Sequence, residues 1–313
     1  MLDPQARALI GLMIQRQVPP VHTLAPEQAR SLYRDRRSFT QPEPPPIGEV
    51  QSLRTEGGVP LRLYRPLQPG VKAVLVYFHG GGWTIGDLDT HDVLCRQLCA
   101  AADVAVVSVD YRLAPEARFP AAVDDCVAAT RWVQREGAAL GLDVSRLAVG
   151  GDSAGGNLGA VVSIVLRDAG DALPADQLLI YPATDQRAGA PSHTANGQGY
   201  LLTRDSVAYY ASQYMGPQGD LSDWRASPLL APDLTRLPPA LVLTAGYDPL
   251  RDEGRQYADA LSAAGNSVQY ICFERQVHGF ITMSRVIDEA HTAVDLCAAA
   301  LRRALGAVPA AAV

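Results

Sequence analysis

The amino-acid sequence predicts an α/β fold, in which a parallel or mostly parallel β-sheet is covered by helices on both faces. From Val71 onward, short apolar runs rich in β-branched residues alternate with longer amphipathic stretches, the order expected of strands joined by crossover helices. The apolar runs are continuous, which is typical of strands buried on both faces. Of the 313 residues, 48% are hydrophobic and 19% are charged, which supplies a large core and excludes a disordered chain.

Each element can be placed by its sequence pattern. Residues 49–55 and 60–64, joined through Gly57 and Gly58, predict an antiparallel hairpin at one edge of the sheet. We predict further strands over residues 72–78, 105–109, 147–149, 178–181, 240–244 and 268–273. We predict helices over residues 120–136, 154–167, 251–264 and 287–305. The Ala-rich tail after Gly306 is expected to be frayed.

Two segments do not fit the alternation of strands and helices. Residues 1 to about 40 are helical in pattern and end at a proline-rich breaker. Residues 185–224 begin as a Gly/Ser/Asn-rich loop and continue as one aromatic helix over 207–214. We expect both to lie over the carboxyl edge of the sheet, where α/β folds bind ligands. The expected division is an N-terminal cap (1–45), a core (46–184), a cap insertion (185–225) and the second part of the core (226–313).

Composition and charge exclude several classes of function. The 27 basic and 33 acidic side chains give a net charge of −6, and no long Lys/Arg cluster indicates nucleic-acid binding. No run reaches the roughly 18 apolar residues of a membrane span, and the N-terminal apolar stretch lacks the basic residues and cleavage site of a signal peptide. The cysteines have no metal or redox spacing and are expected to be mostly buried thiols: Cys95, Cys99, Cys126, Cys272 and Cys297. We therefore expect a soluble protein of the reducing cytoplasm.

The segment Gly151-Asp152-Ser153-Ala154-Gly155 matches the pattern G-x-S-x-G. It lies between a predicted strand and a predicted helix, the context in which this pattern forms a sharp turn that projects a nucleophilic serine. Small residues two positions either side of Ser153 suit such a turn, where the backbone of the nucleophile is strained. The alternative is a Gly-rich turn in which Ser153 serves as a helix N-cap. We expect Ser153 to be the nucleophile.

Three consecutive glycines, Gly80-Gly81-Gly82, follow His79 at the end of a predicted strand. Glycine costs conformational entropy on folding, so this run needs a function, and one function is to point backbone N–H groups into a cavity. Such donors stabilise the oxyanion that forms when a nucleophile attacks a carbonyl carbon. We assign the donors to the N–H groups of Gly80, Gly81 and Ala154. A phosphate-binding loop is excluded because the segment matches neither GxxxxGK[ST] nor GxGxxG before a helix.

A serine hydroxyl needs a base to take its proton. Of the six histidines, His278 lies in a short loop between a predicted strand and the last predicted helix, and that loop opens onto the same sheet edge. The orienting acid should follow a strand end between Ser153 and His278, which leaves Asp248 and Asp252. We choose Asp248 because it comes first after the strand, although it also matches a helix-capping signal. The order Ser, Asp, His along the chain is that of α/β-hydrolases.

Four sequence blocks carry a more specific resemblance. They are His79-Gly80-Gly81-Gly82-Trp83, Asp110-Tyr111-Arg112-Leu113-Ala114-Pro115-Glu116, Gly150-Gly151-Asp152-Ser153-Ala154-Gly155-Gly156-Asn157, and Asp248-Pro249-Leu250-Arg251-Asp252 with His278-Gly279-Phe280. On these residues, the chain resembles bacterial carboxylesterases of the hormone-sensitive-lipase-like family (family IV), GDSAG subgroup.

The resemblance implies an α/β-hydrolase fold, with an eight-stranded, mostly parallel sheet and a helical cap formed by the N-terminal helices and an insertion after the sixth strand. It implies hydrolysis of short- to medium-chain carboxylic esters, with a small-molecule ester as the partner and with no metal or other cofactor. Relatives often form dimers, so a homodimer is one expected assembly. Five residues are candidates to line an acyl or alcohol pocket, with packing as the alternative: Trp83, Tyr200, Leu201, Tyr209 and Tyr210.

Two other functions use the same fold. An amidase or arylformamidase would use the same triad, and the sequence does not separate it from an esterase because leaving-group selectivity depends on the shape of the pocket. A ligand-binding receptor, as in the plant gibberellin receptors that resemble this family, is disfavoured. Those receptors lack the catalytic histidine, whereas Ser153, Asp248 and His278 are all present here.

Overall fold

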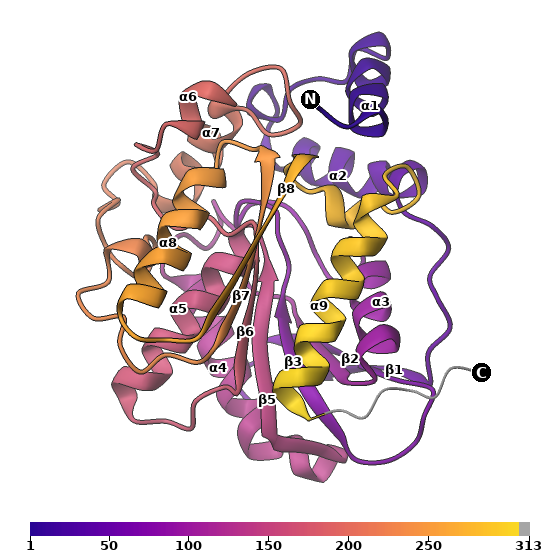
Figure 1. Ribbon diagram of the computed structural model, residues 1–313, viewed down its shortest axis with the longest axis vertical. Helices are drawn as coiled ribbons and strands as arrows, with labels where there is room; N and C mark the ends of the chain where they lie inside the picture. The colour runs from indigo at the N-terminus through magenta and orange to yellow at the C-terminus, as the bar shows by residue number, and fades with distance from the viewer. Residues whose placement is uncertain (307–313) are drawn as a thin grey trace.

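The protein is built around a sheet of eight strands in the order β1-β2-β4-β3-β5-β6-β7-β8 (Figure 1). The computed structural model describes residues 1–306. β1 and β2 form an antiparallel hairpin at one edge, β2 pairs antiparallel with β4, and the other pairs are parallel. The strands are β1 (Glu49–Arg54), β2 (Pro60–Arg65), β3 (Lys72–Phe78), β4 (Ala105–Val109), β5 (Leu142–Asp152), β6 (Asp176–Ile180), β7 (Ala240–Tyr247) and β8 (Val268–Val277). The predicted mostly parallel, eight-stranded sheet is confirmed.

The strands form where the sequence offers apolar runs, but several strand ends differ from the prediction. β3 and β4 are buried along nearly their whole length, as their continuous apolar residues require. β5 and β8 are longer than predicted because polar residues continue the ladder where the apolar pattern stops, and β7 continues through Ala245, Gly246 and Tyr247. In β5, for example, Asp143 pairs with Ala73 of β3 before the register shifts. Hydrophobic pattern alone does not locate such ends.

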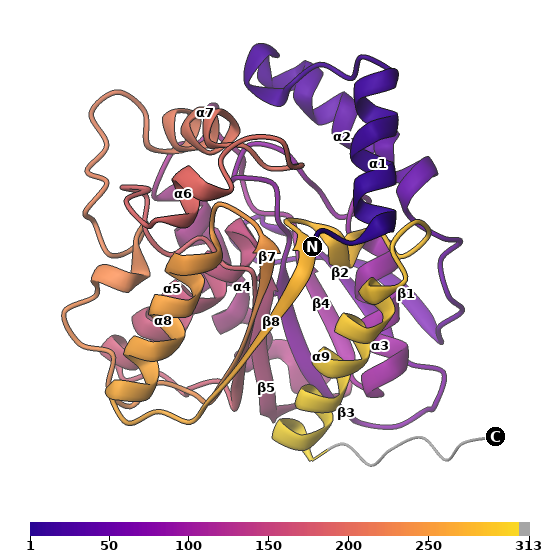
Figure 2. The same ribbon diagram turned by 45° about the horizontal axis from the view of Figure 1, so that its top comes forward.

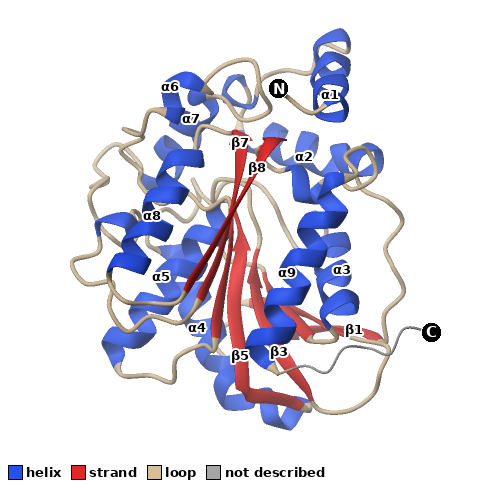
Figure 3. Cartoon of the chain, viewed as in Figure 1, coloured by secondary structure: helices blue, strands red, loops and turns tan. Residues whose placement is uncertain are grey.

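Helices cover both faces of the sheet (Figure 3). α3 and α9 pack on one face, against a cluster that includes Leu75 and Tyr77 of β3. α4, α5 and α8 cover the opposite face, toward which Val74 and Val76 of the same strand point. The helices of these two layers are α3 (Asp92–Ala102), α4 (Ala121–Glu136), α5 (Ala154–Ala169), α8 (Arg251–Ala263) and α9 (Glu289–Leu305). Short 3-10 turns lie in the connections before β5, before β7 and after β8: η2 (Gly137–Leu140), η3 (Pro228–Leu230) and η4 (Phe280–Thr282).

Two further groups of helices lie over the carboxyl ends of the parallel strands (Figure 2). They are α1 (Pro4–Gln15), the 3-10 turn η1 (Val21–Thr23) and α2 (Pro26–Thr40) in the first group, and α6 (Ser192–Ala195) and α7 (Arg204–Met215) in the second. The guanidinium of Arg30 on α2 donates to the carbonyl oxygens of Thr84 (2.8 Å) and Ala114 (2.9 Å). The same group pairs with Glu116 at 2.6 Å. Both segments that break the alternation therefore lie over the expected edge, and α6 is a helix that the sequence pattern did not predict.

Several smaller expectations can be compared with the structure. All five cysteines are free thiols and four of them are buried, as predicted. The Ala-rich tail that is expected to be frayed lies outside the described residues. Within residues 1–306, no helix combines the length and the apolar character needed to cross a membrane.

The pH dependence of stability should reflect Asp176, the buried first residue of β6. Burial raises the pKa of Asp176 to about 7, only partly opposed by Arg303 and the N–H of Gln177. An unfolded aspartate has a pKa of about 3.9, so the folded state keeps a proton that the unfolded state loses as the pH rises from about 4 to about 7. The free energy of unfolding falls over that range and stays low above it.

Asp176→Asn should therefore raise the free energy of unfolding at pH 8 by on the order of 1–2 kcal/mol more than at pH 5. Urea unfolding at the two pH values measures this difference. Asp259→Asn is the matched control because its side chain is 72% exposed, and it should change stability equally at both. An equal effect of Asp176→Asn at pH 5 and pH 8 would contradict the prediction.

Candidate active site

Ser153 lies at the turn between β5 and α5, with φ 57° and ψ −115°. A positive φ is strained for a residue with a side chain, and such strain persists only where the surroundings enforce it. A Cβ atom added to Gly151 would lie 2.0 Å from the carbonyl oxygen of Phe78, and one added to Gly155 would lie 1.8 Å from the same atom. Only glycine fits at these two positions. Ser153 occupies the N-cap position of α5, but its side chain makes no capping bond there and instead contacts His278.

The structure brings Ser153, His278 and Asp248 together at the carboxyl ends of β5, β8 and β7. Nε2 of His278 lies 2.9 Å from Oγ of Ser153, and Nδ1 lies 2.7 Å from Oδ2 of Asp248. With its proton on Nδ1, the ring donates to Asp248 and accepts from Ser153. Asp248 is fully buried. Its other carboxylate oxygen accepts from the N–H of Leu250 at 2.8 Å, so the turn-forming bond and the bond to histidine use different oxygens.

Residues 79–82, which we call the glycine loop, differ in one respect from the predicted set of oxyanion donors. The N–H of Gly80 donates to Oδ1 of Asp152 at 2.9 Å, so it is not free to stabilise an oxyanion, and the prediction for Gly80 is wrong. Within residues 1–306, the N–H groups of Gly81, Gly82 and Ala154 have no protein acceptor, and Gly81 and Gly82 line the cavity above Ser153. Sequence reasoning did not single out Gly82, whose N–H is unbonded within this described part of the chain and whose backbone lines the cavity.

Asp152 is buried between the glycine loop and the neighbouring side chains. It accepts from Tyr77 Oη at 2.7 Å and pairs with His91 Nε2 at 3.2 Å, in addition to its bond from Gly80. Burial alone would raise the pKa of Asp152, but the charge and hydrogen bond of His91, together with the bonds from Tyr77 and Gly80, outweigh burial and lower it. Asp152 therefore remains ionised and holds the glycine loop against the nucleophile turn.

His79 supports the loop from the other side. Its Nδ1 lies 2.9 Å from the carbonyl oxygen of Gly80, and its ring stacks on Tyr111 at a centroid distance of 4.3 Å. The hydroxyl of Tyr111 donates to the carbonyl oxygen of His79 at 2.7 Å. Burial lowers the pKa of His79 to about 4, so the imidazole is neutral at pH 7 and carries a structural hydrogen bond rather than a charge.

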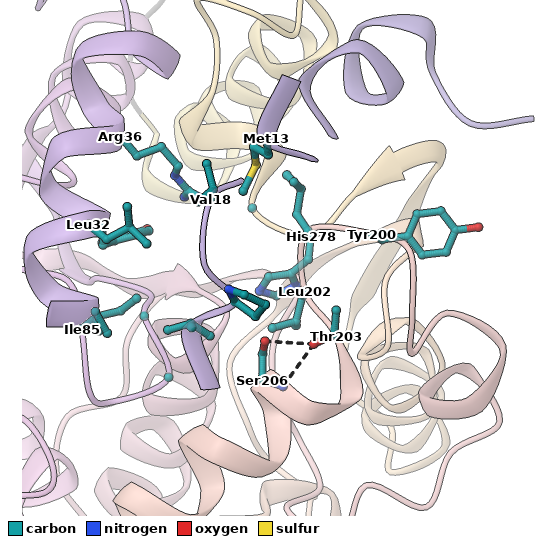
Figure 4. Close-up of a pocket in the computed structure, with 18 of the residues that line it drawn as sticks. Met13, Val18, Leu32, Arg36, Ile85, Tyr200, Leu202, Thr203, Ser206 and His278 are labelled. Carbon is teal, nitrogen blue, oxygen red and sulfur yellow. Dashed lines mark hydrogen bonds between the residues drawn. The ribbon is translucent and has the colours of Figure 1, made fainter. Parts of the chain in front are cut away.

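A cavity of about 670 Å³ opens above Ser153 and His278. Apolar residues of α1, α2 and their connection make up much of its wall, and Figure 4 shows Met13, Val18 and Leu32 facing the space beside His278. Other parts of the wall come from the glycine loop, from the loop before α7, from α7 itself and from segments after β6, β7 and β8. The cavity is thus bounded by the two segments that interrupt the strand–helix alternation.

Four of the five residues expected near a pocket line this cavity: Trp83, Tyr200, Leu201 and Tyr210. Trp83 also stacks on Tyr214 at 4.4 Å, and the Tyr200 ring turns away from His278 in Figure 4. Tyr210 covers Gly82, where an added Cβ would lie 2.2 Å from its ring. Tyr209 is not among the lining residues, because consecutive positions on a helix point about 100° apart.

No cluster of His, Cys, Asp and Glu suited to a metal ion occurs within residues 1–306. The groups that the site does bring together are a serine hydroxyl, an imidazole and backbone N–H donors. Such a set can attack a carbonyl carbon, stabilise the resulting oxyanion and transfer a proton to a leaving group. The fold and these side chains define a serine hydrolase.

Comparison with known proteins agrees with this class. Residues 75–282 match a family described as having the alpha/beta hydrolase fold, and the chain belongs to this family. The carboxylesterase NlhH of Mycobacterium tuberculosis is 42% identical over 98% of this chain and 97% of its own length. The ethyl acetate hydrolase of Pseudomonas putida is 40% identical over 92% of this chain and 93% of its own. A solved ester hydrolase from the metagenome of Lake Arreo is 43% identical, with a TM-score of 0.94 over 98% of this chain and 100% of that one.

Replacement of Asp152 tests the bonds that hold the glycine loop. In Asp152→Asn, an amide with one carbonyl oxygen replaces two carboxylate oxygens, so the donors of Gly80, Tyr77 and His91 lose a charged acceptor. We expect the free energy of unfolding at pH 7 to fall by about 1–3 kcal/mol. Urea unfolding measures it, with the exposed Asp220→Asn as a control that stays within about 0.5 kcal/mol of the parent. Equal stability of the two variants would show that this carboxylate does not anchor the loop.

Proposed function

We propose that this protein is a serine carboxylesterase that hydrolyses short- to medium-chain esters of small molecules through an acyl-enzyme on Ser153. The observation that carries the proposal is the pair of contacts made by His278, 2.9 Å to Ser153 and 2.7 Å to Asp248, at the floor of an apolar cavity. The relatives named carboxylesterase and ethyl acetate hydrolase support esters over the amidase or arylformamidase alternative.

The first step forms the acyl-enzyme. Oγ of Ser153 attacks the ester carbonyl carbon while Nε2 of His278 takes the hydroxyl proton, and Asp248 stabilises the imidazolium and fixes its tautomer. Negative charge develops on the former carbonyl oxygen. The N–H groups of Gly81, Gly82 and Ala154 are the proposed donors to that oxygen, and the loss of one such donor typically costs about 10²–10³ in rate. The imidazolium then protonates the leaving alcohol as the carbon–oxygen bond breaks.

The second step releases the acid. His278 takes a proton from water, whose oxygen attacks the acyl carbon, and the oxyanion again rests on the backbone donors. Collapse of this intermediate breaks the bond to Oγ, and His278 returns the proton to Ser153. The enzyme ends in its starting state, with one ester and one water converted to an acid and an alcohol.

The cavity wall is the proposed binding site for the rest of the ester. We propose that residues 1–45 and 185–225 act as a cap over a core formed by residues 46–184 and 226–313. The side chains proposed to contact the acyl or alcohol group are Trp83, Tyr200, Leu201 and Tyr210. A cavity of about 670 Å³ is within the range of pockets that hold small molecules, which supports a small-molecule ester as the substrate.

Ser153→Ala should abolish ester hydrolysis. Without Oγ no acyl-enzyme forms, so kcat for p-nitrophenyl acetate should fall by on the order of 10⁴ or more. The exposed Ser212→Ala should keep the parent kcat, and circular dichroism checks that both variants are folded. Activity of Ser153→Ala near the parent level would refute the proposed mechanism.

The volume of the cavity sets the expected chain-length preference. A palmitoyl ester carries roughly 12 more methylene groups than a butyryl ester, and these must find room in the same apolar space. We expect kcat/KM to be higher for p-nitrophenyl butyrate than for p-nitrophenyl palmitate, measured below the solubility limit of each. The shared leaving group keeps the chemistry constant, so a higher value for the palmitate would contradict the assignment of chain length.

A further inference from the structure

The short helix α6 and the residue that follows it contact the loop that carries the catalytic acid. We call residues 246–253, from the end of β7 to the first turn of α8, the acid loop. Ser192 Oγ donates to the carbonyl oxygen of Pro249 at 2.6 Å, and the N–H of Ser192 donates to Asp252 Oδ2 at 2.9 Å. Asn196 Nδ2 donates to the carbonyl oxygens of Gly246 and Asp248, at 3.1 Å each. A segment far away in sequence is thus bonded to the backbone of the catalytic acid.

The acid loop needs these donors because the sheet does not provide them. The pairing of β7 with β8 changes register between Ala245 and Tyr247, which releases Gly246 from the regular ladder. Buried carbonyl groups require a donor, and a register change leaves some without one. Besides Asn196, the carbonyl of Gly246 receives Arg251 Nη1 at 3.2 Å, and the carbonyl of Asp248 receives the N–H of Arg251 at 3.2 Å.

The side chain of Asn196 suits this position chemically. One amide nitrogen carries two N–H groups, so a single atom can bridge two carbonyl oxygens. Asn196 is 6% exposed, and water therefore does not readily replace it. A carboxylate of the same shape would place an acceptor against two acceptors, and an alanine would leave both carbonyls with Arg251 alone.

We propose that Asn196 is a positioning residue for Asp248, the carboxylate that orients His278. By bridging the carbonyls of Gly246 and Asp248 it fixes the backbone on either side of Tyr247, and so the direction in which Oδ2 of Asp248 meets His278. α6 and Asn196 do not line the cavity, and their role in this proposal is to hold the acid loop in place. This inference rests on the proposed esterase function, because the consequence of misplacing Asp248 is read through ester hydrolysis.

Substitution of Asn196 gives the first test, with p-nitrophenyl butyrate as substrate. We expect Asn196→Ala to lower kcat by about 10- to 100-fold and Asn196→Asp to lower it further, while KM stays within about twofold. Asn196→Gln keeps the two donors on a longer side chain and should lie above the alanine variant. Gln198→Ala is the matched control, because this exposed residue of the same segment bonds only to Asp205, and it should keep the parent kcat.

A double-mutant cycle separates positioning from general stability. If Asn196 acts through Asp248, then adding Asn196→Ala to Asp248→Ala should change kcat by less than about twofold, because the group that it positions is already absent. A further loss of 10-fold or more in kcat, from Asp248→Ala to the double variant, would overturn the proposal. It would also be overturned if folded Asn196→Ala had the same kcat as the parent protein. If the alanine variant does not fold, Asn196→Ser, which retains one donor, enters the same cycle with the same criteria.

The double-mutant cycle and the Ser153→Ala experiment can contradict the positioning role and the esterase mechanism separately. Ester hydrolysis that survives Ser153→Ala removes the esterase mechanism itself, whatever happens at Asn196. Hydrolysis that requires Ser153 but ignores Asn196 leaves the mechanism intact and removes only the positioning role.

Discussion

The packing of the nucleophile turn against the end of β3 is the constraint on which the site depends. The two flanking glycines of the turn approach the carbonyl oxygen of Phe78 so closely that a Cβ atom would lie 2.0 Å or 1.8 Å from it. Phe78 is the last residue of β3, and the glycine loop follows directly. This backbone contact sets how closely the turn of Ser153 approaches the start of the glycine loop, and the Asp152 side chain then holds the loop at Gly80.

Around this contact, the protein buries two carboxylates and compensates the cost with hydrogen bonds. A buried charge is unfavourable unless its oxygens have donors. Asp152 receives a phenol, a backbone N–H and an imidazole, and Asp248 divides its two oxygens between His278 and the N–H of Leu250. The bonds that make burial tolerable also fix the two loops. Stability and catalysis consequently share the same set of interactions.

Most of the fold and the triad could be predicted from the sequence because both follow from local patterns. Continuous apolar runs locate strands, and residues that follow parallel strands meet at one edge, which brings Ser153, Asp248 and His278 together. The misassigned donor had a different cause. Three consecutive glycines look alike in the sequence, and Gly80 is distinguished only by Asp152, which lies 72 positions away. The contacts of α6 with the acid loop are likewise long-range, and a four-residue helix has too little periodicity to be recognised.

The cavity above the triad has walls that come largely from stretches of chain other than those that supply the reacting groups. α1, α2, the loop before α7 and α7 itself bound much of the space, whereas the serine, the imidazole and the carboxylate stand on strand ends. Residues 192–196 stand apart from those walls and bond instead to the acid loop beside the carboxylate. Evolution can therefore alter the size and polarity of the binding space by changing helices at the rim, and a new selectivity can arise without rebuilding the reaction centre.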